Sequence, residues 1–259
     1  MTTATYLPGK FVWFEHVSSD TSKARAFYQA LCGWGVQAMP MGEQPYDIIM
    51  NGDAGIGGFR TAEPGMHSHW ASYLSVPDVD KSFAASIAAG AKNLMAPMDF
   101  GPVGRAAAVA DPTGAAVCLW KGATGDPVDV PTTPFGGWFW NELFTKDSKA
   151  AVAFYEKVFG YSHDAMDMGA QGTYYVLKDR GGQMRAGVMQ QPPGTPAPSS
   201  WLPYIKVADC DATATKATQL GALSIMAPPT DIPNIGRFAV IIDPLGAPIA
   251  VIKGAPQTS

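Results

Sequence analysis

Apolar and polar residues fall into blocks that predict one strand, one helix and three further strands near the start of the chain. Residues 11–17 are almost wholly apolar and indicate a buried strand. Asp20 can cap a helix, and the apolar residues after it recur at helical spacing until Gly33: Ala24, Phe27, Tyr28 and Leu31. Turn residues then separate three short segments that predict strands: 36–39, 47–50 and 54–59.

The same order restarts at residue 70 and runs to residue 120. A strand over 70–76 precedes a helix that Asp78 opens and Gly90 ends. Three more strands are expected around 93–96, 106–109 and 116–120. The tight turn Asp111-Pro112-Thr113-Gly114 precedes the last of them. The first half of the chain therefore predicts two βαβββ modules in tandem.

The second half of the chain repeats the first. Residues 11–28 match residues 138–155, so that Trp13 falls on Trp140 and Glu15 on Glu142. Further along, Trp70 matches Trp201, and the Asp-Pro-x-Gly turn recurs at 243–246. We therefore predict an α+β fold of four βαβββ modules in two domains. The domain bounds are 1–121 and 137–259, joined by a linker over 122–136 that is dense in Gly, Pro and Asp.

Composition narrows the classes of partner. The net charge is −4 and no basic stripe occurs, which argues against nucleic acid as a partner. No apolar run approaches the ~20 residues of a membrane helix, and the first ten residues lack the apolar core of a signal peptide. We therefore expect a cytoplasmic protein without a membrane partner. Cys32, Cys118 and Cys210 include no Cys-x-x-Cys pair and are expected to be buried thiols that form no disulfide.

Three sequence features carry a family resemblance. The first strand is followed by Ser-x-Asp, Ala-Phe-Tyr and Gly-Trp; its twin ends in Phe-Tyr and Phe-Gly-Tyr; and an Asp-Pro-x-Gly turn precedes the last strand of each half. In these features the chain resembles the vicinal oxygen chelate superfamily, which includes glyoxalase I, extradiol dioxygenases and bleomycin- and fosfomycin-resistance proteins. The resemblance implies that each half forms a U-shaped sheet around a cavity, but a shared fold does not choose among chemistries.

The resemblance also implies six metal-ligand positions, and the residues found there are poor ligands. They are Trp13, Ala71 and Cys118 in the first half, and Trp140, Leu202 and Ala250 in the second. Because a divalent site needs several His or carboxylate ligands, we predict no metal at the family position, although a divalent metal elsewhere stays possible. His69 with Glu15 could form a displaced site; the alternative is that His69 is a connector histidine near the surface.

The remaining inward positions predict an aromatic pocket with a carboxylate in each half. Because side chains alternate along a strand, Glu15 shares the inward face of Trp13, and Glu142 that of Trp140, whereas His16 points to the opposite face. We identify Glu15 and Glu142 as candidate catalytic residues. The candidate ligand-binding residues share the inward parity or flank it: Trp13, His69, Tyr73, Cys118, Trp120, Trp140, Tyr204 and Lys206.

Each of these assignments has a structural alternative. The tryptophans could simply fill the core. The glutamates could be paired structural carboxylates, because a buried carboxylate needs a partner such as Tyr73, Tyr204, an arginine, water or the ligand. Arg105 and Arg237 are possible partners, although each lies beside an aspartate and more readily forms a local pair, Arg105 with Asp99 and Arg237 with Asp231.

Two functions from different classes fit these residues. The resemblance implies a glyoxalase-like lyase or isomerase that acts on a small carbonyl compound or its thiol adduct. The missing ligands favour instead a metal-free protein that binds or sequesters a drug or metabolite, as bleomycin-resistance proteins do. A dioxygenase-like enzyme is a further alternative. In each case the expected partner is a small molecule, and the chain is expected to be a monomer or a homodimer.

Overall fold

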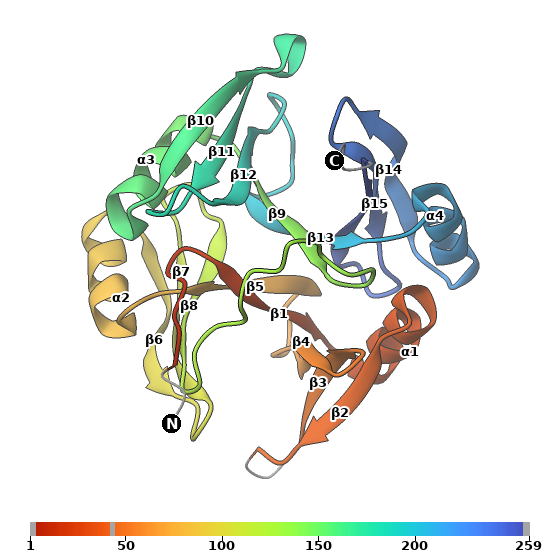
Figure 1. Ribbon diagram of the computed structural model, residues 1–259, viewed down its shortest axis with the longest axis horizontal. Coiled ribbons are helices and arrows are strands. Elements are labelled where there is room, and N and C mark those ends of the chain that lie inside the picture. Colours follow the sequence, from red (N-terminus) through yellow and green to blue (C-terminus); the bar gives the residue numbers. More distant parts are fainter. Residues whose placement is uncertain (1–3, 42–44, 256–259) are drawn as a thin grey trace. The chain divides into compact units, whose positions relative to one another are not determined.

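A computed structural model describes residues 4–41 and 45–255, and within them it confirms four βαβββ modules. Module 1 contains β1 (Phe11–Ser18), α1 (Thr21–Cys32), β2 (Gly35–Met39), β3 (Tyr46–Asn51) and β4 (Ala54–Thr61). Module 2 contains β5 (His69–Ser75), α2 (Val79–Ala88), β6 (Lys92–Asp99), β7 (Gly104–Ala110) and β8 (Ala116–Gly122). Figure 1 follows these elements from red to yellow-green.

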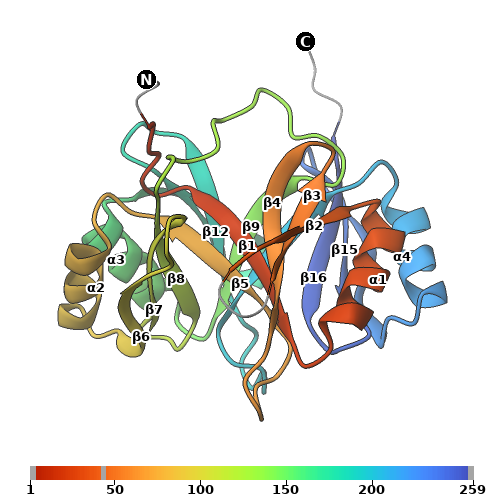
Figure 2. The same cartoon turned by 90° about the horizontal axis from the view of Figure 1, so that it is seen from below.

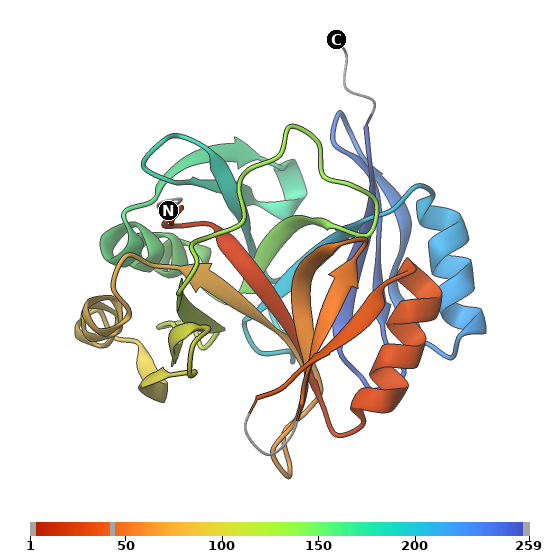
Figure 3. The same ribbon diagram turned by 60° about the horizontal axis from the view of Figure 1, so that its bottom comes forward.

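The second half of the chain repeats this order. Module 3 contains β9 (Trp138–Thr145), α3 (Ser148–Phe159), β10 (Ser162–Asp167), a short 3-10 helix (Gly169–Gln171), β11 (Thr173–Lys178) and β12 (Met184–Gln190). Module 4 contains β13 (Ser200–Lys206), α4 (Cys210–Gln219), β14 (Ser224–Ile232), β15 (Gly236–Ile242) and β16 (Pro248–Gly254). Residues 123–137 form neither helix nor strand, and Figure 3 shows them as a plain tube between β8 and β9.

Each half of the chain supplies one eight-stranded mixed sheet. The strand orders are β2-β3-β4-β1-β5-β8-β7-β6 and β10-β11-β12-β9-β13-β16-β15-β14. Within a module, the first and last strands run parallel, as β1 and β4 do, and the other pairs are antiparallel. The helix makes this parallel pairing possible, because a crossover must return the chain to the same end of the sheet. The expected α+β class is therefore confirmed.

By packing, the chain divides into two compact units that each join non-consecutive modules. Unit 1 contains modules 2 and 3, within residues 4–12, 71–129 and 140–201. Unit 2 contains modules 1 and 4, within residues 13–70, 130–139 and 202–255. In unit 1 helix α2 packs beside α3, and in unit 2 helix α1 lies near α4 (Figure 2). A core of buried side chains, including Leu119, Tyr155 and Leu177, fills unit 1.

The four α-helices of the described residues begin at aspartate caps, as the sequence predicts for Asp20 and Asp78. Asp20, Asp78, Asp147 and Asp209 are the N-cap residues, and each carboxylate accepts a hydrogen bond from the backbone N–H three residues later. Gly33 and Gly160 end α1 and α3 in the left-handed conformation, which a side chain would strain. In the described part of the chain, no helix combines the length and apolar character needed to cross a membrane.

Candidate functional site

The first candidate site is a chain of hydrogen bonds in unit 2, which we call the Glu15 cluster. Nε1 of Trp13 donates to the hydroxyl of Tyr46 over 3.0 Å, and that hydroxyl donates to Oε1 of Glu15 over 2.8 Å. Nε of Arg60 donates to Oε2 of Glu15 over 2.6 Å. The Glu15 side chain is 5% exposed and that of Arg60 is 43% exposed. A buried carboxylate is thus held by a phenol and a guanidinium.

Strand register brings these residues together. Glu15 on β1 is paired with Gly58 on β4, and Gly58 is also paired with Ile48 on β3. A side chain on Gly58 would collide with the hydroxyl of Tyr46, so glycine at this position makes room for the phenol to reach the carboxylate. The cluster therefore depends on Gly58 because glycine has no side chain, and not because the backbone forms a turn there.

Unit 1 repeats this arrangement in the Glu142 cluster. Nε1 of Trp140 donates to the hydroxyl of Tyr174 over 2.9 Å, and that hydroxyl interacts in turn with the carboxylate of Glu142. Glu142 on β9 is paired with Gly187 on β12, where a side chain would again collide with the tyrosine hydroxyl. The same four residue types thus recur in the same relationship: tryptophan, tyrosine, glutamate and glycine.

The two clusters differ in their cation. Arg60 lies two residues beyond Gly58 on β4, and Met189 lies two residues beyond Gly187 on β12. Arg60 provides a guanidinium to Glu15, whereas the equivalent residue in the Glu142 cluster, Met189, has a thioether side chain. The first cluster is partly a salt bridge, whereas this position of the second is apolar.

Burial keeps both phenols protonated. It raises the pKa of Tyr46 well above the ordinary value of a tyrosine, and the adjacent charge of Glu15 raises it further. Burial likewise raises the pKa of Tyr174, and Glu142 adds to the shift. A phenol with a raised pKa stays a hydrogen-bond donor at neutral pH, so each tyrosine can fix the orientation of its carboxylate.

Tyr46, Tyr174 and Arg60 are the residues that sequence reasoning missed. Tyr73 and Tyr204 stay predicted partners of the two carboxylates. Arg105 instead pairs with Asp80 and Asp99, and Arg237 with Asp211 and Asp231. The expectation of local pairs at these two arginines is thereby confirmed. A tyrosine two residues before the residue paired with a strand glycine was the available signal, but it required the β3–β4 register.

The other candidate ligand-binding residues make contacts inside each unit. In unit 1 the ring of Tyr73 lies 6.1 Å from that of Trp120, and Tyr73 is paired in register with Cys118. In unit 2 the ring of Tyr204 lies 6.3 Å from that of Phe238. Nζ of Lys206 donates to the backbone carbonyl of Thr133 and lies over the ring of Phe135, so this lysine contacts the linker.

Two of the three cysteines differ from expectation. Cys210 is buried, as predicted, but Cys32 and Cys118 are only half-buried. Cys32 is the last residue of α1, next to Gly33, and Cys118 alternates with buried Val117 and Leu119 on β8. Cys118 therefore faces the opposite side of the sheet from buried Val117 and Leu119, which explains its partial exposure.

His69 lies near the Glu15 cluster in a state that suits a neutral imidazole. Burial lowers the pKa of His69, and the charge of Arg60 contributes in the same direction. Its Nδ1 interacts with the carbonyl oxygen of His67 over 2.9 Å. The displaced metal site that we considered would need further ligands beside His69 and Glu15. Among the described residues, no group of three or more His, Cys, Asp or Glu side chains is placed to hold a metal ion.

The residues at the metal-ligand positions that the resemblance implies do not fit a divalent metal. These six expected positions contain two tryptophans, two alanines, a leucine and Cys118. Aliphatic and indole side chains offer no lone pair to a hard divalent cation, and a single thiol does not complete a site. We accordingly assign no step of a mechanism to a metal.

Comparison with known proteins places the chain in a family. The model of the glyoxalase/bleomycin resistance protein/dioxygenase superfamily matches residues 138–251. The chain is 38% identical over 264 residues to a protein named putative glyoxylase CFP32 of Mycobacterium tuberculosis, with 97% of each chain covered. It is 29% identical over 276 residues to the anthracycline biosynthesis protein DnrV of Streptomyces peucetius, with 96% of this chain and 94% of that protein covered.

Solved structures show the same fold at low sequence identity. The Mn(II)-bound glyoxalase from Novosphingobium aromaticivorans superposes with a TM-score of 0.65 at 14% identity, covering 95% of this chain and 82% of that one. The fold, the repeated modules and the relatives agree. The chain belongs to the vicinal oxygen chelate superfamily, the superfamily of glyoxalases, bleomycin resistance proteins and dioxygenases.

Proposed function

We propose that this protein binds a small organic molecule at the Glu142 cluster without the help of a metal ion. The observation that carries the proposal is the repeated Trp–Tyr–Glu chain. Trp140 and Glu142 lie on the first strand of module 3, where metal-binding relatives are expected to place ligands. Such a chain replaces a metal by an aromatic surface and a fixed hydrogen-bond acceptor.

The contacts of Glu142 define the chemistry of the ligand. Tyr174 hydrogen-bonds to the carboxylate of Glu142, and an ionised carboxylate can only accept hydrogen bonds. The ligand would therefore present a hydroxyl, thiol or amide N–H to Glu142 and a flat or compact body to Trp140. Small carbonyl compounds, their thiol adducts and hydroxylated aromatic molecules meet this description. The names of the relatives, a putative glyoxylase and a protein of anthracycline biosynthesis, agree with that range.

The Glu15 cluster is the less suitable of the two for a ligand. Arg60 already forms a 2.6 Å ion pair with Glu15, so a ligand that donates to this carboxylate would compete with a guanidinium. At the matching position Met189 offers apolar, adaptable surface. We therefore assign ligand binding first to Glu142 and a mainly structural role to Glu15.

A glyoxalase-like reaction is the second candidate function. A fixed carboxylate beside a bound carbonyl compound can take a proton from the neighbouring carbon, which is the step that a lyase or isomerase of this type needs. The 38% identity to a protein named putative glyoxylase supports this alternative. Both candidate functions, binding without turnover and proton transfer, require Glu142. A substitution of Glu142 therefore does not separate them, whereas a measurement of product formation does.

Two probes separate these functions. The hemithioacetal of methylglyoxal represents the thiol adducts, and 2,6-dihydroxyanthraquinone represents the hydroxylated aromatics. We expect at least one of them to bind protein that has been stripped with EDTA, as measured by calorimetry. Isomerisation of the hemithioacetal by stripped protein would establish the enzyme; binding without product would establish the binding protein. Binding or turnover that appears only after a divalent metal is added would contradict metal independence.

A further inference from the structure

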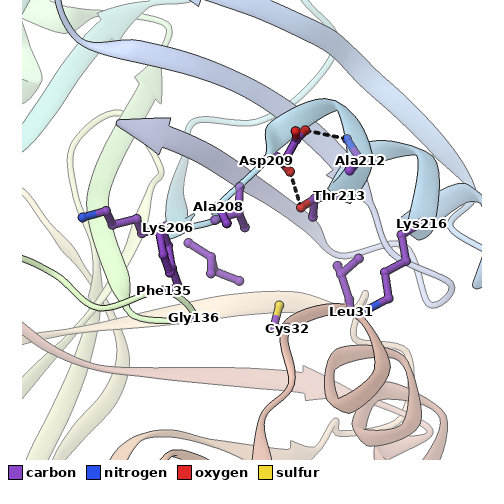
Figure 4. Close-up of a pocket in the computed structure, with 12 residues that line it drawn as sticks. Leu31, Cys32, Phe135, Gly136, Lys206, Ala208, Asp209, Ala212, Thr213 and Lys216 are labelled. Carbon is purple, nitrogen blue, oxygen red and sulfur yellow. Dashed lines mark hydrogen bonds between the residues drawn. The ribbon is translucent and has the colours of Figure 1, made fainter. Parts of the chain in front are cut away.

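Two cavities lie beside helix ends, one in each unit. The larger, in unit 1, has a volume of about 480 Å³, and the smaller, in unit 2, about 290 Å³ (Figure 4). We call them the unit 1 pocket and the unit 2 pocket. Neither shares a lining residue with the Glu15 or Glu142 cluster.

The two pockets are copies of one another through the internal repeat. Val158 and Phe159 at the end of α3 line the first, and their repeat partners Leu31 and Cys32 line the second. Ser82 near the start of α2 corresponds in the same way to Thr213 of α4. The repeat therefore preserves a cavity between the end of one helix and the beginning of another.

A turn that contains a glycine lines each pocket, and the hydrogen bonds of this turn also repeat. In unit 1 the N–H of Gly9 donates to the carbonyl of Ser75, and the hydroxyl of Tyr161 donates to the carbonyl of Gly9. In unit 2 the N–H of Gly136 donates to the carbonyl of Lys206, and Nε1 of Trp34 donates to the carbonyl of Gly136. The same hydrogen bonds therefore position the wall of each pocket in both units.

Charge distinguishes the unit 1 pocket. Arg185, whose side chain is 8% exposed, is bound by Asp129 and Asp179, so these three charges form a neutralised wall together with Lys10 on Asp129. Arg180 also lines the pocket and forms no ion pair with any described residue. An added Cβ on Gly160 would lie 2.7 Å from Nε of Arg180, which places the guanidinium at the C-terminal end of α3.

We propose that the unit 1 pocket binds a small organic anion with an apolar body, and that Arg180 anchors its carboxylate or sulfonate. The volume lies within the range of small-molecule sites. Six apolar residues would contact the body of the ligand: Leu7, Pro8, Val76, Pro77, Val158 and Phe159. An arginine that no acid neutralises favours an anion, and its planar donors fit a carboxylate.

The unit 2 pocket provides a matched control within the same chain. It is smaller, and its wall carries Cys32, Lys206 and Lys216 in place of the arginines (Figure 4). Burial raises the pKa of the Cys32 thiol to about 12, so this group is neither an anion nor a reactive thiolate at neutral pH. Lys206 is already engaged by the carbonyl of Thr133. Lys216 is a point charge without the planar donors of a guanidinium, so we expect a weaker anion site there.

The probe for this proposal is 8-anilinonaphthalene-1-sulfonate, which is fluorescent, apolar and anionic. We expect one molecule to bind per chain, octanoate to displace it, and affinity to fall as NaCl rises from 0.05 to 0.5 M. Arg180→Ala should weaken binding by roughly tenfold or more, because a charge-assisted hydrogen bond contributes about 1.5–3 kcal/mol. Arg180→Lys should lose less, and the matched variant Lys216→Ala should bind as the native protein does.

Three results would overturn the proposal: unchanged affinity in Arg180→Ala, an equal loss in Lys216→Ala, or no displacement by octanoate. Melting temperatures near that of the native protein are expected for both variants, because both side chains lie at exposed positions. Glu142→Gln should leave binding of this probe unchanged, since Glu142 does not line the pocket. Failure of this proposal is therefore distinguishable from failure of the proposed function.

Discussion

The hydroxyl of Tyr28 donates a 3.0 Å hydrogen bond to Asp243, which lies 215 residues further along the chain. The repeat makes the same bond in unit 1, where the hydroxyl of Tyr155 donates to Asp111 over 3.2 Å. Each tyrosine also accepts from a tryptophan, Trp70 or Trp201. The aspartates belong to the two Asp-Pro-x-Gly turns, so the turn of one module is tied to the helix of another inside each compact unit.

Removal of these hydroxyls should destabilise the protein unequally. His16 lies 2.7 Å from Oδ2 of Asp243, whereas the repeat partner of His16 is Leu143. Tyr28→Phe therefore leaves His16 on Oδ2 of Asp243, whereas Tyr155→Phe removes the hydroxyl that reaches Oδ2 of Asp111 and leaves Thr113 on Oδ1. We expect Tyr155→Phe to cost about 2–3 kcal/mol and Tyr28→Phe about 1 kcal/mol of the free energy of unfolding. Urea denaturation measures both; equal costs would contradict the role assigned to His16.

Substitution of the two strand glycines should damage the clusters from within. A Cβ at Gly58 or Gly187 collides with a buried tyrosine hydroxyl, so we expect Gly58→Ala and Gly187→Ala each to destabilise by roughly 1–3 kcal/mol. Gly35→Ala on β2 is the matched control, because its Cβ would meet only ordinary contacts at 3.5 Å and beyond. Thermal unfolding that shows equal effects at Gly35 and Gly58 would refute the steric explanation.

Loss of the guanidinium in the Glu15 cluster should cost more than an ordinary surface change. Arg60→Met gives the Glu15 cluster the residue found in the Glu142 cluster, and leaves a carboxylate of 5% exposure without its cation. We expect a loss of about 1–3 kcal/mol. The charge-neutral double variant Arg60→Met with Glu15→Gln should recover part of this loss. A double variant less stable than the sum of the single effects would argue against the ion pair.

The pair of Asp129 with Arg185 should contribute stability that acid removes. The hydrogen bond from Arg185 lowers the pKa of Asp129 to about 2, below its value of about 3.9 in an unfolded chain. A lowered folded-state pKa means that the contribution is present above about pH 4 and is lost as the pH falls through about 2. Because Asp129 is 46% exposed, we expect at most about 1 kcal/mol.

The variant Asp129→Asn isolates this contribution. The difference in unfolding free energy between native protein and variant should be constant from pH 6 to pH 5 and should shrink towards zero near pH 2. A difference that does not change over this range would show that the carboxylate charge is not the cause.

Hydrophobic periodicity and the internal repeat were sufficient to predict the fold, because local residues determine where each helix begins and where each turn lies. Asp20 and Asp147 cap their helices wherever the rest of the chain lies, and strand parity correctly separates His16 from Glu15. His16 contacts Tyr28 and Trp70, while Glu15 contacts Tyr46. Local signals of this kind need no knowledge of the tertiary structure.

The partners of the buried carboxylates could not be predicted in the same way. Tyr46 reaches Glu15 only through the register of β3 on β4, which shifts between Ile49 and Met50. A one-residue change in register would place the tyrosine on the other face of the sheet. The tie between Tyr28 and Asp243 depends on the packing of module 1 with module 4, and no repeat offset in the sequence indicates that choice.

The most direct test of ligand binding at Glu142 is calorimetric titration of metal-stripped protein with the hemithioacetal and with 2,6-dihydroxyanthraquinone. Native protein, Glu142→Gln and the matched variant Glu15→Gln are compared, with melting temperatures as the control for folding. We predict that Glu142→Gln binds the accepted probe about ten- to a hundredfold more weakly at a near-native melting temperature, and that Glu15→Gln changes affinity less than threefold. Equal affinity of native protein and Glu142→Gln, or binding that returns only with added divalent metal, would contradict metal-independent binding at Glu142.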